Sequence, residues 1–456
     1  MRVKWMIGFV MALAQGGLVA APADQNWPQW RGPLGTGVAP HADPPVKWSE
    51  TQNVKWKSRI PGFGTSTPII WDNLVLIHTA ISTAKAEPPV TPSAEPAAES
   101  GERPRRGGGG RRSEKPTEPY QFTVVALDRA TGNALWQKNL RQEVPHEGHH
   151  PDHGFASASP VTDGQQIISY FGSRGLYCLD MKGNVLWQKD LGKMQTRNSF
   201  GEGSSPALQG NVVVVNWDHE GADFIAAFDK LSGKELWRQP RSEPSGWSTP
   251  LVVKHDNRLQ VIVNGTEKIR SYDLATGRFN WECGGMTANA IPTPVAGHGM
   301  AFVTSGFRGS ALLAIKLGRT GDLTGTDAIA WSHNKGTPYV PSPLLYDNVL
   351  YFFAGNNATL SCFDAKTGKA NYEAERLSGM FGMYASPVGA AGRVYIVGRD
   401  GGAVVLRKSG TVETLATNKL DDKFDASPAA VGKELFLRGH DYVYCIAESV
   451  QTSAKR

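Results

Sequence analysis

Cysteine and long hydrophobic runs are both scarce in this chain. Four cysteines among 456 residues argue against a fold held together by disulfide bonds. After the first 23 residues, no run approaches the roughly 18 apolar residues that a membrane-spanning helix needs. The pattern also lacks helical periodicity, so neither a disulfide scaffold nor a helical membrane protein is expected.

Positive charge is less abundant than the net value suggests. The formal charge is +6, but five arginines fall within one low-complexity stretch, and the rest of the chain is near balance. These are Arg103, Arg105, Arg106, Arg111 and Arg112. Because the remaining charges nearly cancel, no nucleic-acid partner is expected.

Glycine and proline, in contrast, are plentiful, and they mark an internal repeat. The 51 glycines and 29 prolines suit short strands joined by tight turns. A Ser/Thr-Pro pair recurs eight times, at intervals of 41 to 49 residues apart from a first interval of 92 that holds an insertion at residues 82–119. The pairs are Thr67-Pro68, Ser159-Pro160, Ser205-Pro206, Thr249-Pro250, Thr293-Pro294, Ser342-Pro343, Ser386-Pro387 and Ser427-Pro428.

Each repeat predicts four short strands. The first two follow the proline, and the third ends in an aspartate such as Asp229. A turn then contains a glycine such as Gly233, which supplies the positive φ of a hairpin, and a large aromatic follows four residues later, as at Trp237. Four strands per roughly 44 residues predict an all-β fold, an eight-bladed β-propeller with the tryptophans packed between neighbouring blades.

The two ends of the chain predict how the ring closes. The eighth repeat lacks its last strand, whereas residues 53–57 resemble the outer strand at 134–138 and precede the first repeat. We therefore expect an N-terminal strand to complete the eighth blade, which removes an open sheet edge. The predicted organisation comprises a signal peptide at 1–23, an N-terminal segment at 24–52, the propeller at 53–448 with its insertion at 82–119, and a tail at 449–456.

The first 23 residues have the pattern of a secretory signal. Arg2 and Lys4 precede an apolar stretch at 5–14, and small residues follow before the polar residues at 24–26. The alternative is a buried N-terminal helix. A cleaved signal predicts a periplasmic or secreted protein, and neither a paired arginine nor a lipid-acceptor cysteine accompanies it.

The repeat resembles that of pyrroloquinoline-quinone (PQQ) enzymes. The motif runs from Ala126-Leu127-Asp128 to Trp136, the resemblance covers residues 48–448, and the start at 27–33 is similar to exported bacterial PQQ-like propellers. Resemblance to quinoprotein dehydrogenases implies a PQQ- and calcium-dependent oxidoreductase. Those enzymes carry adjacent cysteines beside the cofactor, and many carry a haem motif, neither of which this sequence contains.

The second kind of relative is the scaffold subunit of the outer-membrane β-barrel assembly machinery. That protein is similar in blade count but carries a lipid, for which this chain has no acceptor cysteine. The sequence favours a monomeric binding or scaffold protein with a protein partner or a small polar ligand. The first alternative is the PQQ-dependent oxidoreductase. A third class, carbohydrate binding, fits the aromatic residues of the loops but has no motif of its own, and no residue is assigned a catalytic role.

One face of the propeller gathers the loops in which the repeat breaks down. These loops precede the first strand of each blade or join its second and third strands, and they surround a central funnel. Their candidate residues are Arg174, Arg197, Asn198, Glu202, Trp217, Asp218, His219, Glu220, Trp247, Asn289, Arg308, Tyr339, Asn356, Asn357, Tyr384, Arg399, Asp400, Asp425 and His440. Concave sites with convergent polar groups commonly bind ligands, although exposed loops can also be polar only because they are solvated.

Two more specific hypotheses concern this face. The first is that Arg174, Arg197, Arg308 and Arg399 bind a small anionic or polar ligand, with Trp247 as a stacking surface. The second is that the run Asp218-His219-Glu220 supports acid–base chemistry or binds calcium. No twelve-residue calcium loop is present, so calcium remains part of the quinoprotein alternative.

A histidine-rich segment precedes the second blade. It contains His146, His149, His150 and His153 with two acidic residues, and such a group could bind zinc, copper or nickel. The alternative is a solvated, flexible loop, because the spacing matches no recognised metal motif.

The insertion at 82–119 and the four cysteines are the remaining features of the sequence. The insertion is rich in Pro, Ala and Glu and then in Arg and Gly, so it cannot bury a core. Its Arg-Gly run could contact nucleic acid, anionic lipid or polysaccharide, or it could be a tolerated loop extension. Cys178, Cys362 and Cys445 occupy one repeat position in separate blades, and Cys283 has no obvious partner, so we predict four free thiols.

Overall fold

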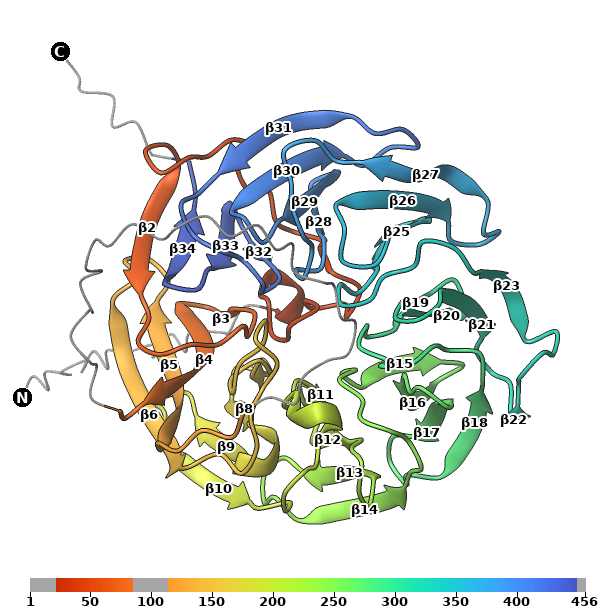
Figure 1. Ribbon diagram of the computed structural model, residues 1–456, viewed down its shortest axis with the longest axis horizontal. Coiled ribbons are helices and arrows are strands. Elements are labelled where there is room, and N and C mark those ends of the chain that lie inside the picture. The colour runs from red at the N-terminus through yellow and green to blue at the C-terminus, as the bar shows by residue number, and fades with distance from the viewer. Residues whose placement is uncertain (1–21, 85–113, 449–456) are drawn as a thin grey trace, which may run out of the picture.

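The protein is a ring of eight β-sheet blades around a central axis (Figure 1). This computed structural model describes residues 22–84 and 114–448. Nearly all of the predicted signal peptide, most of the insertion and the C-terminal tail lie outside these residues. The all-β, eight-bladed architecture predicted from the repeat is confirmed.

The blades follow one another in chain order, from the innermost strand to the outermost. Blade 1 contains β3 (Ile69–Trp71), β4 (Leu74–Ser82), β5 (Tyr120–Asp128) and β6 (Ala134–Glu143). Blade 2 contains β7 (Val161–Thr162), β8 (Gln166–Tyr170), β9 (Leu176–Asp180) and β10 (Val185–Lys189). Blade 3 contains β11 (Ala207–Gln209), β12 (Val212–Trp217), β13 (Phe224–Asp229) and β14 (Glu235–Pro240). Blade 4 contains β15 (Leu251–His255), β16 (Arg258–Val263), β17 (Ile269–Asp273) and β18 (Phe279–Cys283).

The second half of the ring repeats this order. Blade 5 contains β19 (Val295–Gly297), β20 (Met300–Ser305), β21 (Ala311–Lys316) and β23 (Ile329–His333). Blade 6 contains β24 (Leu344–Tyr346), β25 (Val349–Phe353), β26 (Thr359–Asp364) and β27 (Ala370–Arg376). Blade 7 contains β28 (Val388–Ala390), β29 (Arg393–Val397), β30 (Gly402–Arg407) and β31 (Thr414–Lys419). Blade 8 contains β32 (Ala429–Val431), β33 (Glu434–Arg438), β34 (Tyr442–Ile446) and β2 (Val54–Arg59).

Two short strands extend blades beyond four strands. β1 (Val38–Ala39) pairs in parallel with β28 at the inner edge of blade 7. β22 (Gly321–Asp322) pairs in parallel with β18 at the outer edge of blade 4. Three short 3-10 helices lie in connections: η1 (Ala23–Gln25), η2 (Gly172–Arg174) and η3 (Arg197–Ser199).

An N-terminal strand closes the ring, as the sequence predicted. β2 pairs antiparallel with β34, with Val54 opposite Ile446 and Arg59 opposite Tyr442. In Figure 1 the red-orange β2 lies at the outer edge of the blue blade that ends the chain. Blade 8 therefore joins the two ends of the propeller and leaves no broken blade.

The middle strands are apolar on both faces because each blade packs between two others. In β12 the residues Val213 to Trp217 are all buried, whereas the outer strand β14 buries only Trp237. Sheets covered on both faces contain continuous apolar runs rather than alternating ones. The hydrophobic core is accordingly a series of layers between blades.

The repeated tryptophan and glycine form one contact between neighbouring blades. Trp187 of blade 2 donates from Nε1 to the carbonyl oxygen of Lys230 in blade 3 at 2.7 Å. Its ring covers Gly233, which has a φ of 69° and where a Cβ atom would lie 2.7 Å from the ring. The same pairing joins Trp237 to Gly277 in the next blade. The glycine is therefore required both by its turn and by the tryptophan above it.

All four cysteines are buried and free, as predicted. Cys178, Cys362 and Cys445 lie on the third strands of blades 2, 6 and 8. Burial raises the pKa of the Cys283 thiol to about 11. These thiols are therefore protonated packing groups rather than nucleophiles at neutral pH.

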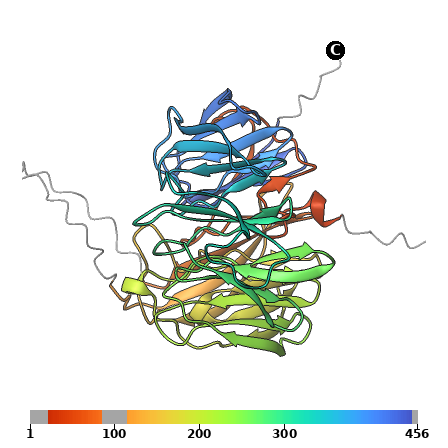
Figure 2. The same ribbon diagram turned by 90° about the vertical axis from the view of Figure 1, so that its right-hand side faces the viewer.

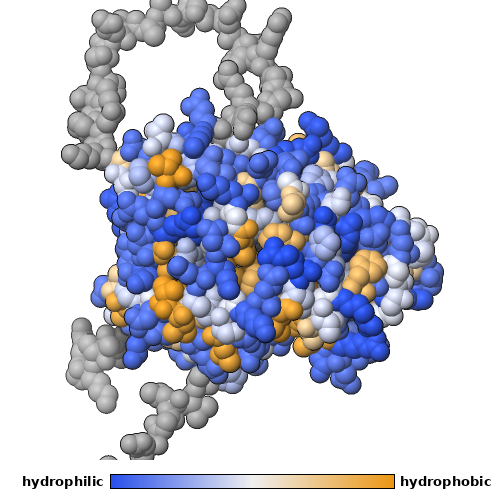
Figure 3. Space-filling model, turned by 90° about the horizontal axis from the view of Figure 1, so that it is seen from below, coloured by the Kyte–Doolittle hydropathy of each residue, from blue (hydrophilic) through white to orange (hydrophobic). Residues whose placement is uncertain are grey.

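The rim of the disc is mainly hydrophilic, with isolated apolar side chains. Figure 3 views the rim at blades 2 and 3, where the outer strands expose Leu186 and Leu236. Within residues 22–84 and 114–448, no helix has the length and apolar character needed to cross a membrane.

We predict that Gly233→Ala destabilises the protein by about 2–4 kcal/mol, because left-handed strain adds to a clash with Trp187. Gly210→Ala is the control. Gly210 lies in the same blade with a φ of 56°, but a Cβ atom added there would have no other atom within 4 Å. Gly210→Ala should therefore lower the free energy of unfolding only by the left-handed backbone strain, about 1–2 kcal/mol. Guanidinium unfolding of the two variants measures the difference, and equal losses would contradict the packing role of Gly233.

Candidate ligand-binding funnel

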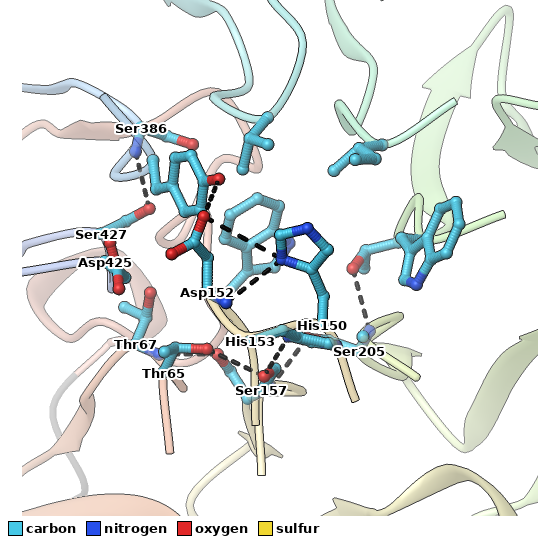
Figure 4. Close-up of a pocket in the computed structure, with 18 of the residues that line it drawn as sticks. Thr65, Thr67, His150, Asp152, His153, Ser157, Ser205, Ser386, Asp425 and Ser427 are labelled. Atoms are coloured by element: carbon cyan, nitrogen blue, oxygen red, sulfur yellow. Dashed lines mark hydrogen bonds and ion pairs between the residues drawn. The ribbon is translucent and has the colours of Figure 1, made fainter. Parts of the chain in front are cut away.

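A cavity of about 230 Å³ lies on the axis of the propeller. Its wall contains hydroxyl side chains from the Ser/Thr-Pro pairs of six blades (Figure 4). They are Thr67, Ser159, Ser205, Thr249, Ser386 and Ser427. The residues that mark the repeat in the sequence therefore also line the site.

These hydroxyls are held by hydrogen bonds that run from blade to blade. The backbone N–H of Thr67 donates to Ser159 Oγ at 2.9 Å, and the N–H of Ser159 donates to Ser205 Oγ at 2.9 Å. Five further bonds of 2.9–3.0 Å continue the series to Ser427. The hydroxyls of Ser159 and of the six Ser or Thr residues that follow it in the series each accept one bond from the backbone and retain a proton to donate.

The N-terminal segment forms the floor of the cavity. In the edge-on view of Figure 2, the red start of this segment projects from one face of the disc. Trp27 bridges to Ile70 on the inner strand of blade 1, and Trp30 lines the cavity. Arg31 is 2% exposed and donates to the carbonyl oxygens of Pro343, at 2.8 Å, and Pro387. Burial lowers the pKa of Arg31 to about 9.

The histidine-rich segment at 146–153, which we call the strap, crosses the mouth of the funnel. Asp152 is bonded through Oδ1 to a guanidinium nitrogen of Arg399 at 2.9 Å, and its Oδ2 accepts from the Tyr384 hydroxyl at 2.9 Å. Arg399 also donates to Asp425 at 2.6 Å, and Asp425 is bonded to His440 at 2.9 Å. The strap thus links the start of blade 2 to the loops of blades 7 and 8 (Figure 4).

The other contacts of the strap hold it against the connection between blades 2 and 3. The His150 backbone N–H donates to the Phe200 carbonyl at 2.9 Å. His153 Nε2 lies 3.0 Å from the Glu202 carbonyl, and its Nδ1 lies 2.7 Å from Ser157 Oγ. Burial lowers the pKa of His153 to about 4, so its ring is neutral at pH 7. The strap is a packed element and not a solvated loop.

Several predicted residues converge on this cavity. Trp247, Tyr339, Tyr384, Asp425, His150 and His153 line it. Trp247 is fixed by a 2.7 Å hydrogen bond from Nε1 to the Gly201 carbonyl. Arg399 and His440 lie directly behind the lining through their bonds to Asp425.

The four predicted arginines do not converge. Arg174 is 3% exposed and pairs with Glu202 at 2.9 Å, away from the cavity. Arg197 donates to Asn289 at 3.3 Å, and Arg308 is exposed on its loop. Arg399 is already bonded to two carboxylates.

The remaining predicted residues lie elsewhere on the loop face or in its packing. Asn356 Oδ1 accepts from the Val340 backbone N–H at 3.0 Å. Asp400 bonds within its own turn and pairs with Lys419. Asn198 and Asn357 are exposed outside the cavity lining.

The acidic run after β12 is a structural group. Asp218 forms a two-point ion pair with Arg241 at 2.6 and 3.0 Å, and both side chains are fully buried. His219 Nδ1 accepts from the Gln195 N–H at 3.1 Å. Glu220 accepts from the backbone and the hydroxyl of Ser245. Trp217 stacks on Phe224 in the core. These contacts hold the connection between blades 3 and 4.

The charges of the cavity suit an uncharged polar ligand. Among the described residues that line it, the acidic and imidazole side chains are His150, Asp152, His153 and Asp425, and none of the lining residues is Arg or Lys. The hydrogen bond from Arg399 holds the pKa of Asp152 below its usual value. A quinone tricarboxylate requires positive partners, and both lining carboxylates are committed to Arg399 rather than free for calcium. The residues present therefore do not fit PQQ and calcium.

A family comparison accounts for the repeat. The family described as outer membrane protein assembly factor BamB has a sequence model that matches residues 121–370 and, in a second overlapping match, 266–455. The chain belongs to this family. Together the matched segments of the BamB family cover more than half of the sequence. No curated protein matches the sequence.

Solved structures show the same fold at low sequence identity. BamB from Moraxella catarrhalis is 14% identical, with a TM-score of 0.54 over 87% of this chain and 100% of that one. The quinohemoprotein alcohol dehydrogenase from Comamonas testosteroni is 11% identical, with a TM-score of 0.59 over 94% of this chain and 82% of that one. Quinohemoprotein alcohol dehydrogenase ADHIIG from Pseudomonas putida HK5 is 12% identical, with a TM-score of 0.55 over 95% and 83%. At these identities the likeness establishes the propeller alone.

Sequence reasoning missed three parts of the funnel. Trp30 lies in a segment without a repeat, and Asp152 stands out in the sequence only as part of the histidine-rich cluster. The ring hydroxyls look like mere landmarks of the repeat. The one signal for these hydroxyls was the regular recurrence of Ser or Thr before proline. Each pair precedes the first strand of a blade, and the first strands of all blades lie beside the axis, so the recurring hydroxyls meet there.

We predict that Asp218→Ala lowers the free energy of unfolding by about 3–5 kcal/mol, because it leaves the buried Arg241 without a counter-charge. Chemical denaturation measures the loss. Asp400→Ala is the control, since Asp400 is partly exposed and should change stability by less than about 1 kcal/mol. If Asp218→Ala were as stable as the control, the ion pair would not hold the connection between blades 3 and 4.

We predict that acidification destabilises the protein through two neutral histidines. The pKa of His153 is lowered to about 4 and that of His78 to about 3, in both cases mainly by burial. An unfolded histidine has a pKa of about 6.5, so the unfolded state binds protons first. The contribution of these neutral histidines to the free energy of unfolding should be fully present above pH 6.5. It should be lost as the pH falls, toward pH 4 for His153 and toward pH 3 for His78.

The melting temperature at pH 7.5 and pH 5 tests this dependence. His153→Gln keeps a polar side chain but does not titrate, so its melting temperature should fall less between the two pH values than that of the wild type. An equal fall in both proteins would exclude His153 as a contributor.

Proposed function

We propose that this member of the BamB family is a binding protein that holds a small, uncharged polar ligand in the funnel. The observation that carries the proposal is the composition of the cavity. Hydroxyl donors from six blades face aromatic side chains, and the few charged groups are already paired.

The lining offers two complementary kinds of contact. The ring hydroxyls can donate to hydroxyl or carbonyl oxygens of a ligand, because a hydroxyl that accepts a backbone N–H still has its own proton to donate. Trp247, Tyr339 and Trp30 offer flat apolar surfaces. A sugar-like polyol, with polar edges and apolar faces, satisfies both kinds of contact.

Redox catalysis with PQQ is the less favoured function. Adjacent cysteines and a haem motif are missing from the sequence, and the lining has no arginine or lysine for a tricarboxylate. The likeness to quinohemoprotein alcohol dehydrogenases extends to the fold only.

Two features support an exported location. The family description names outer membrane protein assembly, and the first 23 residues have the pattern of a secretory signal. We infer that the protein works outside the cytoplasm, with its loop face directed to a ligand or a partner protein.

Calorimetric titration tests the proposal. The purified protein is titrated with a panel of neutral mono- and disaccharides and separately with PQQ, with and without calcium, while tryptophan fluorescence is recorded. We expect a sugar to bind and PQQ not to bind. Tight, calcium-dependent PQQ binding with dye reduction would instead establish a quinoprotein.

Two aromatic substitutions localise the binding. Trp247→Ala should weaken sugar binding at least about tenfold, or about 1.4 kcal/mol, because it removes a stacking surface. Phe381→Ala is the matched control, since Phe381 lies on the same face but is 66% exposed and outside the cavity lining. Equal effects of the two changes would contradict binding in the funnel.

A further inference from the structure

We propose that His146, Glu147 and Glu202 form a binding site for a divalent transition-metal ion at the base of the strap. This site lies beside the funnel rather than in its lining, so it is independent of the proposed ligand. It also differs from a site made by the four histidines of the strap.

The three side chains come together from two connections. His146 and Glu147 begin the strap, and Glu202 lies in the connection between blades 2 and 3. One ligand atom from each residue lies within 4.8 Å of the other two. Two ligands of one ion lie at most about 4.4 Å apart when each metal–ligand distance is about 2.0–2.2 Å, so these atoms are close to the separation that a shared ion needs.

The orientation of His146 leaves one nitrogen free for a metal. Its Nε2 lies 2.6 Å from the Met194 carbonyl oxygen. A carbonyl only accepts, so Nε2 carries the proton and Nδ1 carries the lone pair. Nδ1 is buried, and no hydrogen-bond partner for it exists among the described residues. Metal-binding histidines characteristically donate their other nitrogen to such a carbonyl.

The local charge favours a cation. Glu147 is 8% exposed, as is the Glu202 side chain. Arg174 forms an ion pair with Glu202 at 2.9 Å and lies 3.8 Å from Glu143. No described cation lies within ion-pair distance of Glu147. Arg141 pairs with Glu143 at 2.5 Å, so Glu147 is the carboxylate here that has no cation beside it among the described residues.

The ligand set selects the class of ion. One imidazole nitrogen with two carboxylate oxygens suits zinc, manganese or iron(II) better than the all-oxygen calcium site. Protonation of Glu147 would neutralise its charge without a metal ion. The metal analysis described below distinguishes a bound ion from a bound proton.

A bound ion would fix the strap at one end. His146 and Glu147 lie six and five residues before Asp152, which bonds to Arg399 at the far side of the mouth. Glu202 contributes its carbonyl to His153 as well as its carboxylate to the site. Coordination would therefore join the strap to the connection that forms one wall of the funnel.

Metal analysis tests the site on the full mature protein. The protein is stripped with EDTA, incubated with Zn²⁺, dialysed and analysed by mass spectrometry, and Co²⁺ replaces Zn²⁺ for absorption spectroscopy. We expect one equivalent of ion and a rise in melting temperature. Wild-type protein that retains no ion and shows no thermal shift would overturn the site and leave the proton as the neutralising group.

Three substitutions identify which residues bind the metal ion. His146→Gln and Glu147→Gln should each reduce retained metal from one equivalent to almost none, whereas His150→Gln, in the same strap, should retain it. If His146→Gln does not fold, Glu147→Gln decides, because its amide oxygen still accepts from Thr196. Equal loss in all three variants would indicate diffuse binding by the strap and overturn the assignment. Sugar binding in the metal-free protein shows separately whether the funnel proposal stands.

Discussion

A ring of hydrogen bonds around the axis organises this propeller. Seven backbone N–H groups donate to the hydroxyl of the Ser or Thr one blade further on, at 2.9–3.0 Å. At the junction of blades 8 and 1, Arg438 donates to Ser66 at 2.9 Å and to the His78 carbonyl. The same ring fixes the inner strands and presents the hydroxyls that line the cavity, so the fold and the site share one constraint.

The outer parts of the fold were predictable because every blade packs against its neighbours through the same recurring residues. The turn glycine, the tryptophan and the closing strand at 54–59 recur with the repeat, and a recurring signal can be read without a structure. Cys178 and its equivalents were assigned correctly for that reason. The repeat says where strands lie, but it does not say what an irregular loop contacts.

The funnel depends on contacts that occur once. Asp152 and Arg399 are separated by 247 residues, and Arg31 reaches carbonyls more than 300 residues away. Breaks in the repeat located Tyr384, Arg399 and Asp425 correctly on the loop face. The same criterion also selected Asp218 and Arg174, whose charges are neutralised in buried ion pairs. Polar residues that interrupt a repeat can serve blade connections as well as ligands, and only their partners distinguish the two roles.

The strap shows why histidines in a row need not act together. His146 and His153 both direct one nitrogen to a backbone carbonyl, yet His153 uses its second nitrogen on Ser157, while that of His146 has no hydrogen-bond partner in the described structure. Burial then favours the neutral ring in His153, which makes it a fixed wall of the cavity. His146 lies instead beside the carboxylates of Glu147 and Glu202, and no described cation lies within ion-pair distance of Glu147. Two histidines seven positions apart therefore have different chemistry because their neighbours, and not their spacing, determine what each can bind.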